Sequence, residues 1–154
     1  MKGQPEVIDK LNELLAEELT AINQYFLHAE MCGDWGYEKL HERIEKRSMQ
    51  EMKHAERLME RILFLEGRPV VSELNKITIG DSVMKQLTND QGAELDAIKM
   101  YNDAVALTSK LGDNGTKVLV ESILTDEEDH LDWIEEQLDQ IDQMGYQQYL
   151  NNQV

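Results

Sequence analysis

Cysteine and proline are both scarce in this sequence. Its 154 residues include one cysteine, Cys32, and two prolines, Pro5 and Pro69. A lone cysteine cannot form a disulfide bond within the chain, which favours a reducing compartment. Because proline breaks helices, its scarcity leaves long stretches of the chain free to form them.

Long apolar runs are absent as well. No run approaches the roughly 20 residues of a membrane-spanning helix, and the N-terminal Met1-Lys2-Gly3-Gln4 lacks the apolar core of a signal peptide. We therefore expect a cytoplasmic protein that has no membrane partner. The length suits a single domain over residues 1–154, large enough to bury a substantial core.

Positive charge is in deficit, since 15 basic residues face 31 acidic ones and the net charge is −16. Such a surface repels the phosphates of nucleic acids and anionic membranes, and it attracts cations. Ordinary solubility explains the same excess. The charge therefore argues against a nucleic-acid partner but does not identify a ligand.

Helical periodicity extends over most of the sequence. Apolar residues recur at spacings of three and four between glycine-containing turns, and Pro5 suits the first position of a helix. We expect an all-α protein with four long helices and a short fifth helix. Their approximate ranges are 5–34, 37–66, 81–111, 115–144 and 146–152.

The segment from Gly67 to Gly80 is too long for a tight turn between helices. At about 1.5 Å per residue the preceding helix would measure about 43 Å. The segment, when extended, reaches roughly 46 to 50 Å. It can therefore cross the whole bundle, and a bundle with one long crossover is the ferritin-like arrangement. The alternative is a flexible joint between two separate helical hairpins.

A glutamate interrupts the apolar stripe of each long helix near its middle, and two of these glutamates are followed three positions later by a histidine. The six residues are Glu18, Glu51, His54, Glu94, Glu127 and His130. Four buried carboxylates repel one another unless protons or cations accompany them. Two divalent cations would balance them, and this is the known ligand set of ferritin-like di-iron proteins. The alternative is solvated acids and ordinary core histidines.

The same residues repeat at one offset of 76 positions. The pairs are Glu18 and Glu94, Glu51 and Glu127, His54 and His130, and Tyr25 and Tyr101. The first helical hairpin is thus echoed by the second, as a pseudo-two-fold bundle requires. Tyr25 lies two turns after Glu18, where it could hydrogen-bond a ligand carboxylate or donate an electron. Packing in the core explains Tyr25 equally well.

Three polar residues stand apart from this pattern. Glu38 and His41 form another Glu-x-x-His motif, but it is rotated about 220° around its helix from the motif that begins at Glu51. We expect both to be solvated residues near a helix start. His28 has no glutamate three positions before it, so we expect a surface or interface role for it.

The ligand types narrow the choice of metal. Four carboxylates and two imidazoles favour iron or manganese over copper or structural zinc, which take more nitrogen or sulfur. Ligand type alone does not separate iron from manganese.

The sequence resembles the bacterioferritins along essentially its whole length. The likeness lies in residues 1–3, 18–28, 34–36, 51–56, 61–67 and 126–133 and in the tail to Leu150. It implies a homo-oligomeric shell of 24 subunits, built from dimers, with a ferroxidase centre in each subunit. Two Fe²⁺ ions would be oxidised there by O₂ or H₂O₂ and stored as ferric mineral, and an associated ferredoxin would supply electrons for release.

The resemblance also implies roles for single residues. Glu51 and Glu127 would bridge two iron ions, Glu18 and His54 would complete one position, and Glu94 and His130 the other. Met52 would be the axial ligand of haem b shared between two subunits. Some members carry a further inner-surface iron site, but this chain has Lys46 and Gln50 at the corresponding positions.

Three other functions are alternatives to iron storage. A di-iron oxidase or peroxidase of the rubrerythrin type would need a rubredoxin-like cysteine cluster, which a lone Cys32 cannot form. A DNA-protecting mini-ferritin is disfavoured because the chain has no basic tail. The third is a structural or haem-carrying bundle without redox iron.

Overall fold

The computed structural model describes residues 1–154, and its chain is helical except for short turns and one long segment. The helices are α1 (Pro5–Asp34), α2 (Glu38–Phe64), α3 (Val83–Lys110), α4 (Asn114–Met144) and α5 (Tyr146–Asn151). None of them is apolar enough over a sufficient length to cross a membrane.

The helix ends follow from local chemistry. Pro5 occupies the first turn of α1, where its missing N–H costs nothing. The Ser82 side chain accepts a hydrogen bond from the backbone N–H of Lys85 and caps α3, and Asp113 caps α4 in the same way. Gly145, at a φ of 85°, ends α4 and turns the chain into α5.

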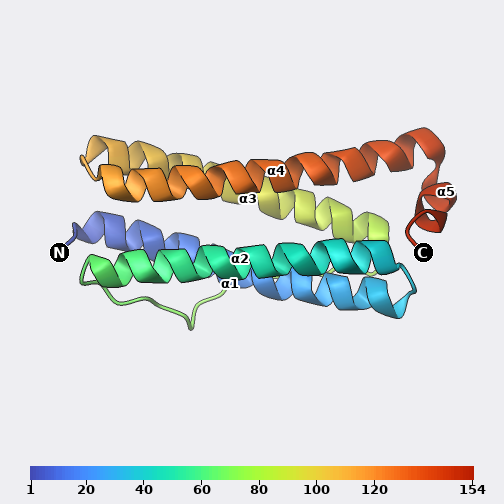
Figure 1. Ribbon diagram of the computed structural model, residues 1–154, viewed down its shortest axis with the longest axis horizontal. Coiled ribbons are helices and arrows are strands. Elements are labelled where there is room, and N and C mark those ends of the chain that lie inside the picture. Colours follow the sequence, from blue (N-terminus) through green and yellow to red (C-terminus); the bar gives the residue numbers. More distant parts are fainter.

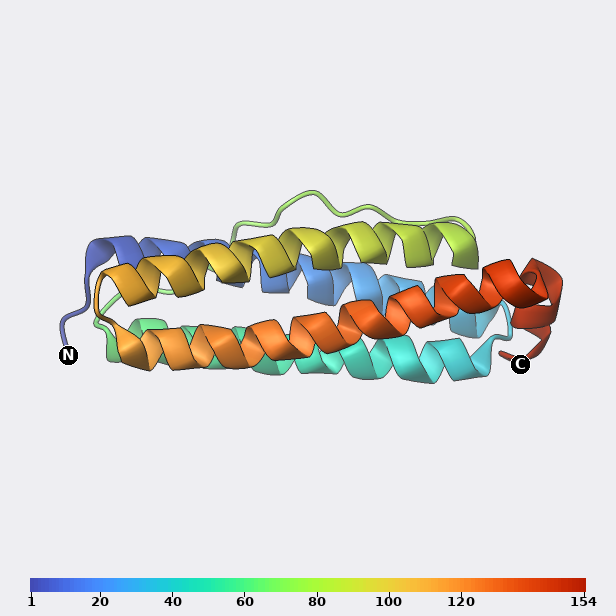
Figure 2. The same ribbon diagram turned by 90° about the horizontal axis from the view of Figure 1, so that it is seen from above.

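The four long helices form two hairpins that lie side by side, α1 with α2 and α3 with α4 (Figure 1). The segment between α2 and α3 runs along the bundle, so that α2 and α3 point in the same direction (Figures 1 and 2). The prediction of a ferritin-like four-helix bundle with one long crossover and a short fifth helix is confirmed. Two separately jointed hairpins are excluded, because α1 contacts α3 and α2 contacts α4.

Hydrogen bonds from α1 hold the crossover in place. The backbone N–H groups of Asn75, Thr78 and Gly80 donate in turn to Thr20 at 2.7 Å, to Gln24 at 3.1 Å and to His28 Nε2 at 3.0 Å. These α1 residues are buried beneath the segment. The crossover is therefore a fixed part of the fold.

The expectation of a surface or interface role for His28 is wrong. Its side chain is fully buried, and Nδ1 lies 2.9 Å from the buried Asp90 carboxylate on α3. Because Nε2 accepts from Gly80, Nδ1 carries the hydrogen that Asp90 accepts. A Cβ on Gly80 would clash with the backbone of Gln86, so this close approach requires glycine.

Two apolar clusters fill the bundle on either side of its middle. One contains Leu11, Leu58 and Ile123, and the other contains Leu40 and Ile141. Along each long helix the charged residues of the predicted site lie between these clusters. The core thus places packed hydrocarbon on both sides of a polar centre.

Candidate metal centre

The structure brings the six residues of the predicted ligand set into one buried cluster. Glu18 comes from α1, Glu51 and His54 from α2, Glu94 from α3, and Glu127 and His130 from α4. Each glutamate is at most 2% exposed, and His130 is the most exposed of the six at 7%. We call these six residues the carboxylate cluster.

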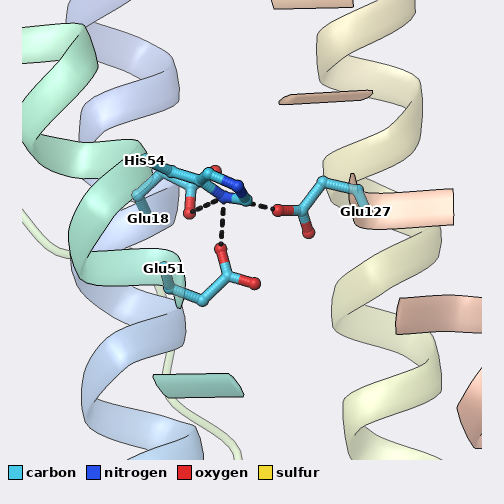
Figure 3. A group of neighbouring side chains, drawn as sticks. All are labelled: Glu18, Glu51, His54 and Glu127. Carbon is cyan, nitrogen blue, oxygen red and sulfur yellow. Dashed lines mark hydrogen bonds and ion pairs between the residues drawn. The ribbon is translucent and has the colours of Figure 1, made fainter. Parts of the chain in front are cut away.

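One half of the cluster surrounds His54 (Figure 3). Its Nδ1 atom lies 3.0 Å from Glu127, 3.2 Å from Glu51 and 3.5 Å from Glu18. Each of these residues offers one atom to a group in which all the ligand atoms lie within 4.8 Å of one another. That spacing suits a single bound cation, and we call this group the Glu18 position.

The other half surrounds His130, and we call it the Glu94 position. His130 Nδ1 lies 3.1 Å from Glu51, 3.9 Å from Glu94 and 3.9 Å from Glu127. The ligand atoms of these four residues again lie within 4.8 Å of one another. The cluster therefore offers two adjacent positions of the same composition.

Glu51 and Glu127 belong to both positions. Glu51 directs Oε2 to His54 and Oε1 to His130, and Glu127 directs Oε1 to His54 and Oε2 to His130. Each carboxylate thus presents a separate oxygen to each position. This is the geometry that a bridging ligand requires.

The outer nitrogens of the two histidines have different partners. His54 Nε2 lies 2.9 Å from Asp126, and His130 Nε2 lies 2.7 Å from the amide oxygen of Gln50. An acceptor at Nε2 keeps the hydrogen there and leaves the Nδ1 lone pair for a metal. Neither Asp126 nor Gln50 was predicted to have such a role, because each lies beside the apolar stripe of its helix and not on it.

Two tyrosines support the terminal glutamates. Tyr25 donates to Glu94 at 2.6 Å, and Tyr101 donates to Glu18 at 2.5 Å. The contact is reciprocal between α1 and α3, as the shared offset of 76 positions indicates. Of the interpretations left open for Tyr25, the structure shows both a hydrogen bond to a candidate ligand carboxylate and packing in an apolar cluster.

Several polar atoms in the cluster have no hydrogen-bond partner although they are fully buried. They are Glu18 Oε2, Glu51 Oε1, Glu94 Oε2, Glu127 Oε1 and His130 Nδ1. A buried polar atom without a partner costs about 1–3 kcal/mol, and more when it carries charge. The donor set and its orphaned atoms therefore fit divalent cations of the iron and manganese type.

The protonation of the cluster reflects the same crowding. Burial, followed by repulsion from Glu51, raises the pKa of Glu18 and that of Glu127 well above the usual value. Burial would also raise the pKa of Glu51, but close polar contacts with Glu18, His130 and His54 hold that pKa well below its usual value. Protons therefore stabilise the cluster wherever cations do not.

Arg47 is a residue of this site that sequence analysis left without a role. It lies on α2 one turn before Glu51, is 4% exposed, and forms an ion pair with Glu94. It also donates to the Tyr25 hydroxyl at 3.1 Å, with its guanidinium carbon 4.2 Å from the centre of the ring. The feature of the sequence that could have indicated a role for Arg47 is its position in the apolar stripe of α2, where a charged side chain is unusual.

The remaining candidates lie outside the cluster. Met52 is 57% exposed on α2. Lys46 and Gln50 line a cleft of about 260 Å³ that reaches His130. Glu38 is exposed as expected, whereas His41 is half-buried and contacts the carbonyl of Ala29 at 2.8 Å.

Known proteins resemble this chain along most of its length. The Ferritin-like domain family matches residues 8–144. A bacterioferritin of Brucella melitensis is 41% identical over 149 residues, which is 97% of this chain and 92% of that protein. A bacterioferritin of Rhodobacter capsulatus is 41% identical over 147 residues, covering 96% of this chain and 91% of the relative. A bacterioferritin of Mycolicibacterium paratuberculosis is 41% identical over 149 residues, which is 97% of this chain and 94% of that protein.

Proposed function

Because this chain belongs to the bacterioferritin family, within the ferritin-like proteins, we propose that it takes up Fe²⁺, oxidises it at the carboxylate cluster and stores the ferric product. The observation that carries the proposal is the placement of Glu51 and Glu127, each with one oxygen toward His54 and the other toward His130. Two shared carboxylates are what two iron ions at adjacent positions need.

The remaining ligands divide between the two positions. Glu18 and His54 complete one, and Glu94 and His130 complete the other. Tyr25 and Tyr101 orient the terminal glutamates through their hydrogen bonds at 2.6 and 2.5 Å. Because the four carboxylates match the charge of two Fe²⁺, the cluster binds its substrate without a large excess of either sign.

The reaction follows from holding two Fe²⁺ ions side by side. Each ion gives up one electron and becomes Fe³⁺. The two electrons, together with two protons, convert one H₂O₂ to two waters or one O₂ to H₂O₂. Proximity lets a single oxidant take both electrons in one encounter. Carboxylate oxygens remain good ligands as the iron becomes Fe³⁺.

Storage requires a closed container, and we propose a homo-oligomeric shell of 24 subunits built from dimers. An associated ferredoxin is the proposed source of electrons for iron release. The cytoplasm is the proposed location, since the free Cys32 suits a reducing compartment. Native mass spectrometry should find one species with the mass of 24 chains, and iron loading should place a dense mineral inside it.

Haem b is the second proposed cofactor, with Met52 as its axial ligand from each of two subunits. The exposure of Met52 supports this proposal, because a thioether on the outer face of α2 is free to meet a group at a dimer interface. The test is the haem absorption spectrum of purified protein. Met52→Leu should lose the spectrum of bis-methionine ligation, while Met49→Leu, a change at another exposed methionine of α2, should keep it.

Iron binding and oxidation test the main proposal. An anaerobic titration with Fe²⁺ should break at two ions per subunit, and added air should oxidise both rapidly. Glu94→Ala should slow the fast oxidation by at least about tenfold because it removes a ligand to the second ion. Asp96→Asn, a change on the exposed side of α3, is the matched control. An unchanged rate in Glu94→Ala would reject the assignment of the cluster.

A further inference from the structure

A positively charged side chain of the protein, that of Arg47, contacts the carboxylate cluster. Arg47 projects from α2, and its guanidinium forms an ion pair with Oε1 of Glu94 while also donating to the Tyr25 hydroxyl. Only 4% of the side chain is exposed. An arginine in such surroundings stays charged at every physiological pH.

This charge has no counterpart in the other half of the bundle. The residue 76 positions after Arg47 is Ile123 on α4, which is fully buried and belongs to an apolar cluster. Glu94 accepts hydrogen bonds from both Tyr25 and Arg47, whereas Glu18 accepts one from Tyr101 and otherwise faces His54. Arg47 therefore breaks the pseudo-two-fold symmetry of the terminal glutamates, and the different partners of the two histidines, Asp126 and Gln50, break it at the outer nitrogens.

A cation that enters the Glu94 position meets this arginine directly. It must share Glu94 with the guanidinium or displace it, and it experiences the repulsion of a fixed positive charge. Inside a protein such repulsion is weakened little by solvent. The Glu18 position has the same number of carboxylates, and the ion pairs of its glutamates are all with histidines and not with an arginine.

We propose that Arg47 makes the two metal positions unequal, so that the Glu18 position fills first and the Glu94 position fills only as Arg47 releases Glu94. This inference rests on the proposed function, because it assumes that both positions bind cations. To the proposed function it adds the order in which the two metal positions fill and the residue that sets this order. Arg47 is a positioning residue and not a metal ligand.

The structure offers a place for the displaced side chain. Arg47 lines the cleft of about 260 Å³ that reaches His130, and Asp126 and Asp129 line the same cleft. The guanidinium can therefore turn from Glu94 toward the carboxylates of Asp126 and Asp129, so that its charge still faces negative side chains. Release of Glu94 and opening of the Glu94 position would be the same movement.

The test is an anaerobic titration with Co²⁺, which does not undergo the oxidation and reports its ligands through visible absorption. The intact shell should bind two ions per subunit in two steps, the first at least about tenfold tighter than the second. Arg47→Met should bring the two affinities to within about threefold by strengthening the second step. Arg43→Met is the matched control, since Arg43 lines the same cleft but lies over Trp133, 5.1 Å from the ring centre, and it should keep the two steps of the wild type.

Two further variants separate this inference from the proposed function. Glu94→Gln should abolish the weaker step alone, and Glu18→Gln should weaken the tighter one. If neither variant changes Co²⁺ binding, the cluster is not the metal site and both proposals fail. If each variant weakens the binding of one ion but the wild type binds its two ions with equal affinity, only the role of Arg47 is overturned.

Crystals of the unaltered protein supply a measurement that does not depend on the folding of a variant. At one Co²⁺ per subunit the anomalous signal should lie at the Glu18 position, with Arg47 still paired to Glu94. At excess Co²⁺ both positions should be filled and Arg47 should point into the cleft. Equal signal at both positions at the lower ratio, or an Arg47 that stays on Glu94 at the higher ratio, would overturn the inference.

Discussion

The Tyr101 hydroxyl on α3 donates a hydrogen bond of 2.5 Å to Oε1 of Glu18 on α1, and both side chains are fully enclosed by the bundle. The bond joins the two hairpins at the level of the carboxylate cluster. It also leaves the other oxygen of Glu18 free of hydrogen-bond donors and available to a metal.

Replacing this tyrosine should affect both stability and metal binding. Tyr101→Phe leaves a buried carboxylate oxygen without its donor, which should cost about 1–3 kcal/mol of unfolding free energy. It should also weaken the tighter of the two Co²⁺ steps, because Glu18 loses its orientation. Urea unfolding of the metal-free protein and Co²⁺ titration measure the two effects.

Tyr149→Phe provides the control for that experiment. Tyr149 donates a hydrogen bond of 2.8 Å to Gln137, within the apolar cluster that lies toward α5. Its loss should lower stability by a comparable amount and leave both Co²⁺ steps unchanged. Equal effects of the two variants on Co²⁺ binding would show that Tyr101 acts only through general stability.

The shared carboxylates should be more sensitive to substitution than the terminal ones. Glu51→Gln removes the negative charge of a carboxylate that both positions share. We therefore expect it to reduce Co²⁺ binding to less than one ion per subunit. Glu94→Gln should leave one ion bound. Glu128→Gln, an exposed neighbour of Glu127, should retain two, and equilibrium dialysis with metal analysis gives the three stoichiometries.

The stability of the metal-free protein should fall as the pH rises above about 4.5. Burial and repulsion from Glu51 raise the pKa of Glu18 and that of Glu127 above the usual 4.5, so the folded state holds protons that the unfolded state releases. Stability that depends on those protons is complete below pH 4.5 and is lost as the pH rises through the folded-state pKa. The lowered pKa of Glu51 acts in the opposite sense, but only below its usual 4.5.

Bound cations should reverse this trend, because they replace the protons. Thermal unfolding in EDTA and in Co²⁺, measured at several pH values, gives both curves. Stabilisation by Co²⁺ should grow with pH as fewer protons compete for the carboxylates. A Co²⁺ effect that does not vary with pH would contradict the link between the raised pKa values and the metal site.

The anchor of the crossover gives a prediction that is independent of metal. His28→Ala removes the acceptor of the Gly80 N–H and one donor to Asp90, so we expect a loss of about 2–4 kcal/mol. Hydrogen exchange at the Gly80 amide should accelerate more than at amides in the middle of α2. His41→Ala, at a half-buried site, should have a smaller effect on stability and none on Gly80.

Most of the fold was predictable from local patterns. Helical periodicity indicates which face of each segment is buried, and the length of the segment between Gly67 and Gly80 indicates that it spans the bundle. The Glu-x-x-His spacing places Glu51 and His54 on one face of one helix, and the offset of 76 positions predicts that a second hairpin repeats the arrangement. All of these depend only on distances along the chain.

The contacts of His28 and Arg47 could not be predicted from distances along the chain. His28 lies on the buried side of α1 because the crossover covers it, and no periodicity within α1 reveals where a segment some fifty residues away will lie. Arg47 was visible as an arginine in an apolar stripe, but its partner on α3 was not.

The sequence alone thus determined the helices, their buried faces, the crossover and the six polar residues that meet at the centre, since each follows from spacing within a helix or between equivalent helices. The tertiary structure decided which oxygen of Glu51 faces His54, which nitrogen of His130 faces Gln50, and that Arg47 pairs with Glu94. Those contacts depend on the axial shift and rotation between packed helices, which are set by side-chain packing across the whole bundle.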